Sequence, residues 1–446
     1  MHRHPIAFAV AALVSACAPP PAQCPPVPAC PSAAAARPVP AASAVAAEPA
    51  ASAPPRPTAP RQKATAKLFD DGLAEAGFFP RADAFAAGLD GHALDALLGE
   101  AEKTKSDALI VLAGGRVVAE RYFGQKRGPI ETMSITKSIT ALAVVMLLES
   151  GKLKSLDAPL ADFLPEHAHG KKAAVTLRHL LTQTSGLAHG KDARALNAQK
   201  DRTAYARRAA VLDEPGAVFS YNNEATQLLT LVVEKAAGKK VDAYLDEVLF
   251  RPLGVRGWQW DRDGGDNVQT YYGLALQARD LARIGQLLLD QGSASGRQLI
   301  SKDGVASLHA PSAKNPYYGL LWWIRYERVV HELDPAAKVE GVELAALAGK
   351  QHPSAEAFWL DAGARLSRAE REAVVGFVSS GGKLTRERPD RAIGFYADGS
   401  LGQRLAVFPE QKLVVVRQRR RRPPAEESDA LSFPGLLGLA AALGPR

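Results

Sequence analysis

The pattern of apolar and polar positions begins with two short runs that are typical of strands. Ala108–Leu112 and Arg116–Tyr122 are apolar and partly alternating, and Gly114-Gly115 lies between them. A Gly-Gly pair between two such runs predicts a β-hairpin. Three later runs are also expected to be strands because of their bulky and β-branched residues: Tyr317–Ile324, Arg404–Phe408 and Leu413–Arg417. The pattern therefore predicts an antiparallel sheet built from both ends of the chain.

Helix patterns occupy much of the sequence between these strands. Ser134–Glu149 is apolar nearly all round, which predicts a buried helix. The region of about 152–270 alternates helical segments with loop signals, among them a helix at Glu224–Ala237. Another helix is expected at Leu274–Leu289. We expect the region of about 152–270 to form a separate helical lobe.

A stretch of about 327–391 has helix signals of its own and separates two of the expected strands. Ser367 and Glu370 form a capping-box pattern that opens a helical run to Val378. We expect this stretch to be an insertion. Together the elements predict an α/β (α+β) fold, with an antiparallel sheet flanked by helices, an inserted all-helical lobe, and the site in the cleft between them.

The first 17 residues have the layout of an export signal. Arg3 precedes an apolar stretch from Ile6 to Val14, and Ser15-Ala16-Cys17 follows. Val14 to Cys17 resembles the lipobox of bacterial lipoproteins. The resemblance implies that Cys17 carries a lipid and anchors the protein in the bacterial cell envelope, with its domain in the periplasm or outside the cell. Cleavage after a small residue, without lipid, is the alternative.

Residues 18–65 are expected to form a disordered tether. Ala, Pro, Ser and Val dominate this segment, and such a composition cannot bury a core. The three cysteines, Cys17, Cys24 and Cys30, all precede the folded part. Disulfides, thiolate catalysis and Cys-ligated metal are therefore excluded for the domain. Whether Cys24 and Cys30 pair with each other stays open.

The remaining chain divides into a domain at 66–422 and a C-terminal segment at 423–446, which we expect to contain a last helix. The formal net charge of the 446 residues is +8, and five arginines between Arg417 and Arg422 supply much of it. We expect this run to be solvated, with contact to anionic lipid headgroups as the alternative. A nucleic-acid partner is not expected.

Ser134 and Lys137 form an S-x-x-K pattern at the start of the predicted buried helix. Residues three apart share one helix face, so the two side chains can touch. Lys137 is the only charged residue between Glu131 and Glu149, and apolar surroundings lower the pKa of a lysine toward neutrality. A neutral Lys137 could accept the Ser134 proton; a lysine that reaches the surface is the alternative. Ser380–Lys383 also matches S-x-x-K, but in a loop.

Tyr221-Asn222-Asn223 stands directly before the helix expected from Glu224. Either asparagine suits an N-cap, and a purely structural reading makes Tyr221 a packed aromatic. A tyrosine close to Lys137 could instead pass a proton to a leaving group, while Asn223 hydrogen-bonds the substrate or that lysine.

A third candidate element, Asp398–Gln403, leads directly into the strand expected at Arg404. Gly399 permits another backbone to approach closely. The backbone N–H groups of Ser134 and Ser400 could then form an oxyanion hole for an acyl carbonyl. A plain hairpin turn is the alternative.

These three elements, in this order, resemble the S-x-x-K, Y-x-N and K-T-G motifs of the serine β-lactamase and penicillin-recognising superfamily. The resemblance covers about 66–418. It includes segments typical of the class C-like branch: Leu180–Leu187, Arg251–Gly254 and Ala278–Ala282. The YYGLLWW run and the G-x-x-G-Q at Gly399–Gln403 look most like the 6-aminohexanoate-dimer hydrolases and related carboxylesterases.

The resemblance implies a covalent acyl-enzyme mechanism without a metal or an organic cofactor. The roles it implies are nucleophile for Ser134, base for Lys137, proton donor for Tyr221, the Y-x-N asparagine for Asn223, and the second oxyanion N–H for Ser400 beside Gly399.

Two departures from the motifs bear on the substrate. Ala397-Asp398-Gly399 stands where lactam-binding relatives have a cation in K-T-G, and Gln183 replaces a common histidine. The departures favour small neutral esters or amides over penicillin-type substrates. A β-lactamase or D-alanyl peptidase acting on cell-wall-like substrates is the alternative enzyme. A catalytically silent lipoprotein that binds envelope ligands is the alternative from another class.

Overall fold

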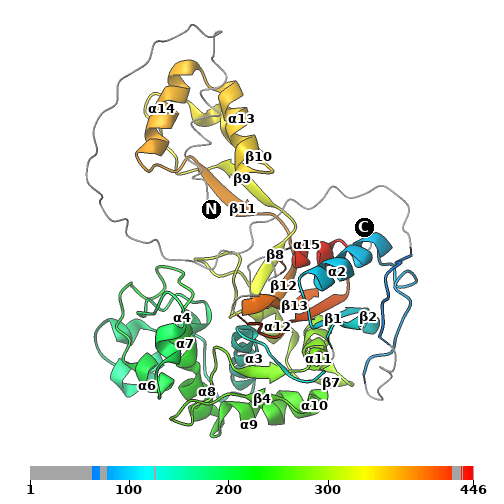
Figure 1. The fold of residues 1–446 in the computed structure, drawn as a ribbon. Helices are drawn as coiled ribbons and strands as arrows, with labels where there is room; N and C mark the ends of the chain where they lie inside the picture. The colour runs from blue at the N-terminus through cyan, green and yellow to red at the C-terminus, as the bar shows by residue number, and fades with distance from the viewer. Residues whose placement is uncertain (1–62, 71–77, 125–126, 424–432, 434, 445–446) are drawn as a thin grey trace. The chain divides into compact units, whose positions relative to one another are not determined.

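A computed structural model describes residues 63–70, 78–124, 127–423, 433 and 435–444. The export signal, Cys17 and all but the last residues of the expected tether lie outside the described residues. Thr65, at the end of that tether, already donates its backbone N–H to Asp95 Oδ2 at 2.8 Å. The described chain divides into two compact units: Tyr326–Arg391, and the residues on either side of that stretch (Figure 1).

The larger unit contains a six-stranded sheet in the order β2-β1-β14-β13-β12-β8. Its strands are β1 (Ala108–Ala113), β2 (Arg116–Tyr122), β8 (Trp323–Tyr326), β12 (Ala392–Gly399), β13 (Gln403–Phe408) and β14 (Leu413–Gln418). The pairs β1–β2, β1–β14, β12–β13 and β13–β14 are antiparallel. The predicted hairpin and the predicted pairing of strands from both ends of the chain are therefore confirmed, with Val111 opposite Val415.

Helices cover both faces of this sheet (Figure 1). Helix α11 (Ala278–Leu289) packs on β1, β13 and β14, and α3 (Ile135–Glu149) packs beside it on β12 and β13. A Cβ added at Gly285 of α11 would lie 2.5 Å from Val414 Cγ1, so this helix needs a glycine where it meets the sheet. Helices α2 (Gly91–Lys103) and α15 (Leu436–Ala441) pack together on the other face.

The helical lobe consists of short helices and turns. Its α-helices are α4 (Leu177–Leu181), α5 (Arg194–Asn197), α6 (Arg202–Arg207), α7 (Asn223–Gln227), α8 (Leu229–Ala237), α9 (Val241–Leu245) and α10 (Arg251–Leu253). Leu228 separates α7 from α8, so the helix expected at 224–237 is two helices. Gly238 ends α8 in the left-handed conformation, with φ 72°.

Two expected elements were partly wrong. Leu274–Leu276 is not the start of a helix but strand β5, which pairs with β3 (Ile130–Glu131) and β4 (Gln259–Trp260). The apolar residues of this segment are compatible with a helix or a strand. Hydrogen bonding to two neighbouring strands makes it a strand.

Tyr317–Ile324 was expected to be one strand, but only Trp323 and Ile324 of it belong to β8. The preceding residues turn: Leu321 has φ 58°, and a Cβ at Gly319 would lie 2.3 Å from Leu308 O. Bulky residues alone therefore gave the wrong strand start, because a close backbone approach bends the chain there.

The arginine run at 417–422 was expected to be solvated, and this is wrong for its first members. Arg417 and Arg419 are 0% and 1% exposed. Arg417 lies in the central strand β14 and donates to Gly402 O at 2.7 Å. Only Arg421 of the run is exposed. A buried guanidinium is tolerated where carbonyl oxygens accept its donors, which a count of charges cannot show.

The smaller unit has a sheet and a core of its own. Strands β9 (Val329–Leu333), β10 (Gln351–His352) and β11 (Thr385–Pro389) pair in the order β10-β9-β11. Helices α13 (Ala355–Arg365) and α14 (Arg368–Ser379) pack with them around Phe358, which is fully buried. The predicted capping box of Ser367 and Glu370 is present at the start of α14.

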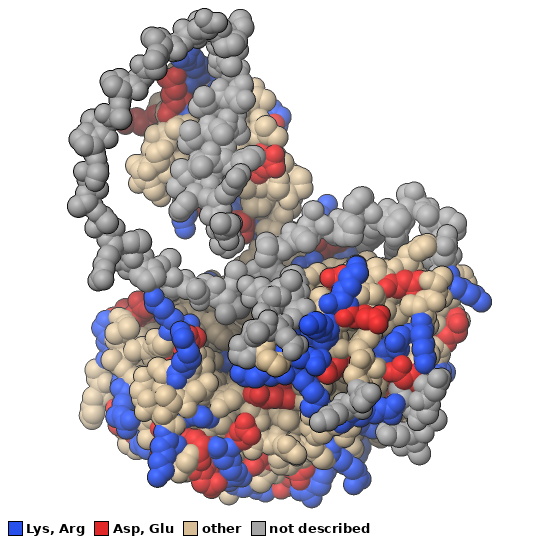
Figure 2. Space-filling view, in the orientation of Figure 1, with Lys and Arg blue, Asp and Glu red and all other residues tan. Residues whose placement is uncertain are grey.

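On the face of the larger unit shown in Figure 2, lysines and arginines are interspersed with acidic side chains. No helix in the described ranges is both long and apolar enough to cross a membrane.

Candidate active site

Ser134 lies at the N-terminal end of the buried helix α3, and Lys137 lies one turn later. Lys137 Nζ is 2.9 Å from Ser134 Oγ. Ser134 is partly exposed, whereas Lys137 is only 1% exposed. Met133, directly before Ser134, has φ 51°, a left-handed conformation that is strained for a non-glycine residue. The sharp turn thus leaves the hydroxyl accessible and the amine covered.

Burial gives Lys137 an unusual titration. Desolvation lowers the pKa of Lys137 to about 7, and the charge of Glu224 opposes part of this shift. Glu224 is itself buried, and its Oε1 accepts the Gly190 N–H at 3.1 Å. Lys137 Nζ also donates to Tyr271 O at 2.9 Å, so its position is fixed from two sides.

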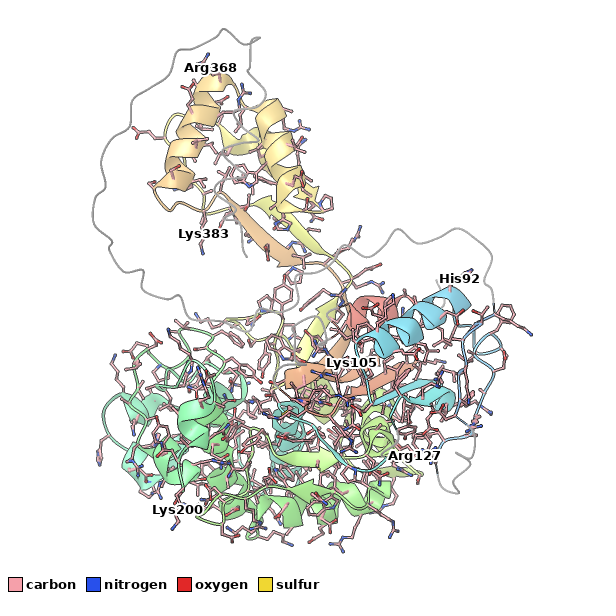
Figure 3. All side chains as sticks on the ribbon, viewed as in Figure 1. His92, Lys105, Arg127, Lys200, Arg368 and Lys383 are labelled. Carbon is pink, nitrogen blue, oxygen red and sulfur yellow. The ribbon has the colours of Figure 1, made fainter. Side chains whose placement is uncertain are left out.

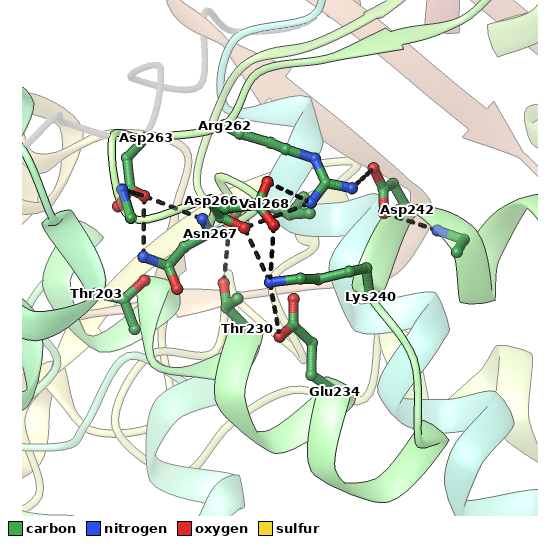
Figure 4. Close-up of polar contacts among 12 residues, drawn as sticks. Thr203, Thr230, Glu234, Lys240, Asp242, Arg262, Asp263, Asp266, Asn267 and Val268 are labelled. Atoms are coloured by element: carbon green, nitrogen blue, oxygen red, sulfur yellow. Dashed lines mark hydrogen bonds and ion pairs between the residues drawn. The ribbon is translucent and has the colours of Figure 1, made fainter.

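A polar network holds the loop that supplies this carbonyl (Figure 4). Arg262 Nη2 lies 2.7 Å from Asp242 Oδ2, and Thr230 Oγ1 donates to Val268 O at 2.9 Å. These contacts tie the loop before Tyr271 to helices α8 and α9. Sequence reasoning missed Tyr271, because a backbone acceptor leaves no residue-type signal.

Tyr221 lies beside the same amine. Lys137 Nζ is 4.9 Å from the centre of the Tyr221 ring. Burial raises the pKa of Tyr221 to about 12, and a hydrogen bond with the Ser134 side chain lowers it in part. The structure therefore brings together three predicted site residues, Ser134, Lys137 and Tyr221.

Aromatic stacking fixes the Tyr221 ring. Trp323 is stacked on Tyr221, with ring centres 6.3 Å apart and planes at 19°. Tyr396 is also stacked on Trp323, with ring centres 6.4 Å apart and planes at 18°. The second tryptophan of the YYGLLWW run thus packs against the Tyr221 ring.

Gln183 holds the chain on either side of Tyr221. Its Oε1 accepts the Asn222 N–H at 2.5 Å, and its backbone carbonyl accepts the Ser220 N–H at 2.8 Å. Gln183 is fully buried and has φ 58°. The sequence marked this residue only as a departure from the family motif. In the fold, Gln183 holds the backbone of Ser220 and Asn222 in place and so fixes the position of Tyr221.

The two asparagines after Tyr221 have different places. Asn222 is the N-cap of α7 and accepts the Ala225 N–H at 2.7 Å. Asn223 is the first residue of α7 and is partly exposed. The structure thus gives the capping role to Asn222 and leaves the Asn223 side chain accessible.

The end of β12 lies against the residues that precede Ser134. A Cβ added at Gly399 would be 2.5 Å from Thr132 O and 3.1 Å from Met133 Cβ. Ser400 follows Gly399 and is exposed. Within the described part of the chain, the backbone N–H groups of Ser134 and Ser400 donate to no backbone carbonyl. Both amides are therefore available to a ligand.

Ala397 and Asp398 stand where lactam-binding relatives have the Lys and Thr of K-T-G, and neither side chain supplies a positive charge. Ala397 is fully buried, and Asp398 forms an ion pair with Arg404 on the neighbouring strand. The described residues contain no group of three or more His, Cys, Asp or Glu side chains arranged to hold a metal ion.

The second S-x-x-K copy has none of these features. Ser380 and Lys383 are exposed on the smaller unit, and Lys383 is labelled at its surface in Figure 3. Ser380 Oγ donates to Phe377 O at 2.8 Å. Burial of the lysine, not the spacing, distinguishes the two copies.

Comparisons with curated proteins found esterase and amide-hydrolase relatives. The chain is 35% identical over 144 residues to Esterase EstB from Burkholderia gladioli, covering 28% of this chain and 36% of that protein. It is 28% identical over 239 residues to the 6-aminohexanoate-dimer hydrolase of Paenarthrobacter ureafaciens, covering 48% of this chain and 59% of the relative. The chain thus spans less than two thirds of the length of these relatives.

Solved structures with the same fold cover more of the chain. EstCE1, a hydrolase with promiscuous acyltransferase activity, has a TM-score of 0.53 at 14% identity, covering 80% of this chain and 99% of that one. The penicillin binding protein from Bacillus halodurans has a TM-score of 0.51 at 18% identity, covering 78% and 98%. These neighbours confirm the predicted fold class of an antiparallel sheet flanked by helices.

The family model described as Beta-lactamase matches residues 93–432, which is most of the chain and includes every candidate site residue except Cys17. The chain therefore belongs to the Beta-lactamase family, in the serine β-lactamase and penicillin-recognising superfamily.

Proposed function

We propose that this protein is a serine hydrolase that forms a covalent acyl ester on Ser134 from small esters or amides. The observation that carries the proposal is the 2.9 Å contact between Ser134 Oγ and Lys137 Nζ, an amine that is 1% exposed. Burial lowers the pKa of this amine to about 7, so a large fraction is neutral at physiological pH. A neutral amine can accept a proton from the serine.

In the first step, the Lys137 amine takes the hydroxyl proton while Ser134 Oγ bonds to the acyl carbon. The carbonyl electron pair moves to oxygen, and the N–H groups of Ser134 and Ser400 stabilise that charge. The tetrahedral adduct then expels the leaving group. Tyr221 keeps its proton at neutral pH, because burial raises its pKa to about 12. It donates this proton to the leaving group and regains one from the Lys137 ammonium.

In the second step, water attacks the acyl carbon and restores the Ser134 hydroxyl. The proton transfers run in reverse: the water proton passes to the Tyr221 phenol and the Lys137 amine, and Lys137 returns a proton to Ser134 Oγ. Asn223, which is partly exposed beside Tyr221, is assigned to substrate binding.

Two findings favour small esters or amides over penicillin-type substrates. The relatives found are described as an esterase and a 6-aminohexanoate-dimer hydrolase. The Asp398–Arg404 pair leaves no free cation at the K-T-G position to bind a lactam carboxylate.

Mass spectrometry of the intact protein after treatment with a fluorophosphonate tests the proposal. The expected result is one adduct that maps to Ser134 and is absent in Ser134→Ala. Turnover of nitrophenyl butyrate above that of a chromogenic cephalosporin is expected for an esterase. A wild type that forms no adduct, under conditions that label a known relative, would favour the catalytically silent binding protein.

We also propose export to the cell envelope and lipid anchoring at Cys17, on the basis of the N-terminal sequence alone. Fractionation of cells that produce the full chain tests this, with Cys17→Ser expected in the soluble fraction and Cys24→Ser as the matched control. Membrane retention of Cys17→Ser would contradict the anchor.

A further inference from the structure

The turn that carries Ser400 has an unusual backbone. It joins β12 to β13, and two successive residues in it, Leu401 and Gly402, have φ angles of 66° and 77°. A leucine in the left-handed region is strained, because its Cβ lies too close to the following carbonyl oxygen. Such a conformation persists only where the surroundings hold it.

Two buried arginines contact the carbonyls of this turn. Arg417 Nη1 donates to Gly402 O at 2.7 Å, with a longer contact of 3.3 Å to Leu401 O. Arg419 Nε donates to Leu401 O at 3.1 Å. Hydrogen bonds from a charged donor are stronger than neutral ones, and burial strengthens them further.

The arginines are themselves fixed in place. Arg417 Nε donates to Ser106 Oγ at 2.7 Å, and its Nη2 donates to Thr104 O at 3.0 Å. The Gln403 side chain binds both backbone groups of Arg419, with its Oε1 accepting the N–H at 3.1 Å. The final Gln of the G-x-x-G-Q motif thus ties the end of β14 to the start of β13.

We infer that Arg417 and Arg419 are positioning residues for acyl transfer, which hold the Leu401 and Gly402 carbonyls so that the Ser400 N–H faces the acyl oxygen. The inference rests on the proposed function of Ser134. Gly399 sets how close the strand comes to Thr132, and the arginines set how the chain turns after it. Both arginines are buried, so we assign them no direct contact with the substrate.

The same arginines place positive charge behind the turn. Arg404 stands opposite Arg417 in the sheet. Burial, followed by the charges of Arg419 and Arg404, lowers the pKa of Arg417 to about 9, while Asp107 opposes the shift. Arg417 is therefore protonated at neutral pH. Positive charge fixed in a region of low dielectric stabilises an oxyanion that develops nearby.

The test compares Arg419→Met, Arg419→Lys and Arg417→Lys with a matched control, Arg421→Met, which changes the exposed arginine of the same run. The kinetic constants for nitrophenyl butyrate, the inhibition constant of phenylboronic acid and the folded fraction by circular dichroism are measured. A boronic acid forms a tetrahedral serine adduct and so reports on the oxyanion site.

For Arg419→Met and Arg417→Lys, kcat and boronate affinity are expected to fall together by about tenfold or more per folded molecule, with KM changed by less than about threefold. Arg419→Lys should recover part of the loss, because it keeps the charge and one donor for Leu401 O. Arg417→Lys also keeps the charge, but a lysine cannot replace the several guanidinium donors that Arg417 uses. The pH midpoint of activity should stay with Lys137 and not move. Arg421→Met should match the wild type.

The outcomes separate this inference from the proposed function. A wild type without a Ser134 adduct removes the proposed function and this inference with it. An active wild type, with Arg419→Met equal to the control per folded molecule, overturns the inference alone. If Arg417→Lys does not fold, the two Arg419 variants decide, since Arg419 Nε donates directly to Leu401 O in the turn.

Discussion

At the scale of single residues, the site depends on one dehydrated amine. Lys137 is buried within the apolar helix α3. Its protonated form at low pH is therefore a buried cation, which costs free energy. Its Nζ donates hydrogen bonds to Ser134 Oγ and Tyr271 O, and the negative charge of Glu224 partly offsets the lowering of its pKa. In the proposed mechanism, this environment lets Lys137 act as a base near neutral pH.

The pH dependence of turnover follows from this pKa. Because only the neutral amine accepts the Ser134 proton, kcat/KM for a nitrophenyl ester should rise with pH through a midpoint near 7. Lys137→Met should lower kcat/KM by at least about a hundredfold and abolish this midpoint. A retained midpoint near 7 in the variant would assign the titration to another group.

The stability of the fold should depend on pH through the same residue. The pKa of Lys137 is about 7 in the folded state and about 10.4 in an unfolded chain, so the unfolded state binds more protons between these values. The free energy of unfolding should therefore increase as the pH rises from about 7 to about 10, by up to roughly 4 kcal/mol. Below pH 7 the burial penalty is fully present.

Thermal unfolding of wild type and Lys137→Met over this pH range measures the effect. The difference in melting temperature should favour the variant at pH 6.5 and shrink toward pH 9. Parallel pH profiles of the two proteins would contradict a buried, titrating lysine.

At the scale of elements, the site forms where the start of α3 and the end of β12 lie close together. Gly399 permits this close approach, because a Cβ at this position would overlap Thr132 O. The glycine thus sets the distance between the two N–H groups that we assign to the oxyanion.

Gly399→Ala should therefore push β12 away from α3 and reduce kcat by about a hundredfold or more, as expected for loss of an oxyanion donor. Gly99→Ala is the matched control, because a Cβ at Gly99 in α2 would meet no atom within 4 Å. That change should leave kcat unaltered and stabilise the helix by up to about 1 kcal/mol. Equal kcat in both variants would disprove the close-approach argument.

At the scale of the whole molecule, the two units have separate hydrophobic cores. The residues around Phe358 form one cluster, and the sheet and its helices form the other. Each proposed catalytic residue belongs to the larger unit. We therefore expect the smaller unit to unfold separately from the larger one.

Phe358→Ala should destabilise the smaller unit by about 3 to 5 kcal/mol, which is typical for loss of a buried phenylalanine. Hydrogen exchange should accelerate in α13 and α14 but not in α3 or β14. Leu360→Ala, which changes an exposed leucine of the same helix, should alter neither. Acceleration of exchange throughout the chain would show a single cooperative unit.

The sequence by itself determined four of the six strands of the large sheet, the buried helix and the pairing of Ser134 with Lys137. Apolar periodicity and residue spacing are local properties, and the strands β1, β2, β13 and β14 and the helix α3 express them directly. The burial of Lys137 could also be anticipated, since no other charge occurs near it in the chain.

Only the tertiary structure decided the contacts made by residues far apart in sequence. The Tyr271 carbonyl, the hydrogen bonds of Gln183 and the buried arginines at the Leu401–Gly402 turn have no local signature. Leu274–Leu276 became a strand through pairing with β3 and β4. A buried guanidinium and a solvated one have the same residue type, and the difference between them is which carbonyls the fold brings within reach.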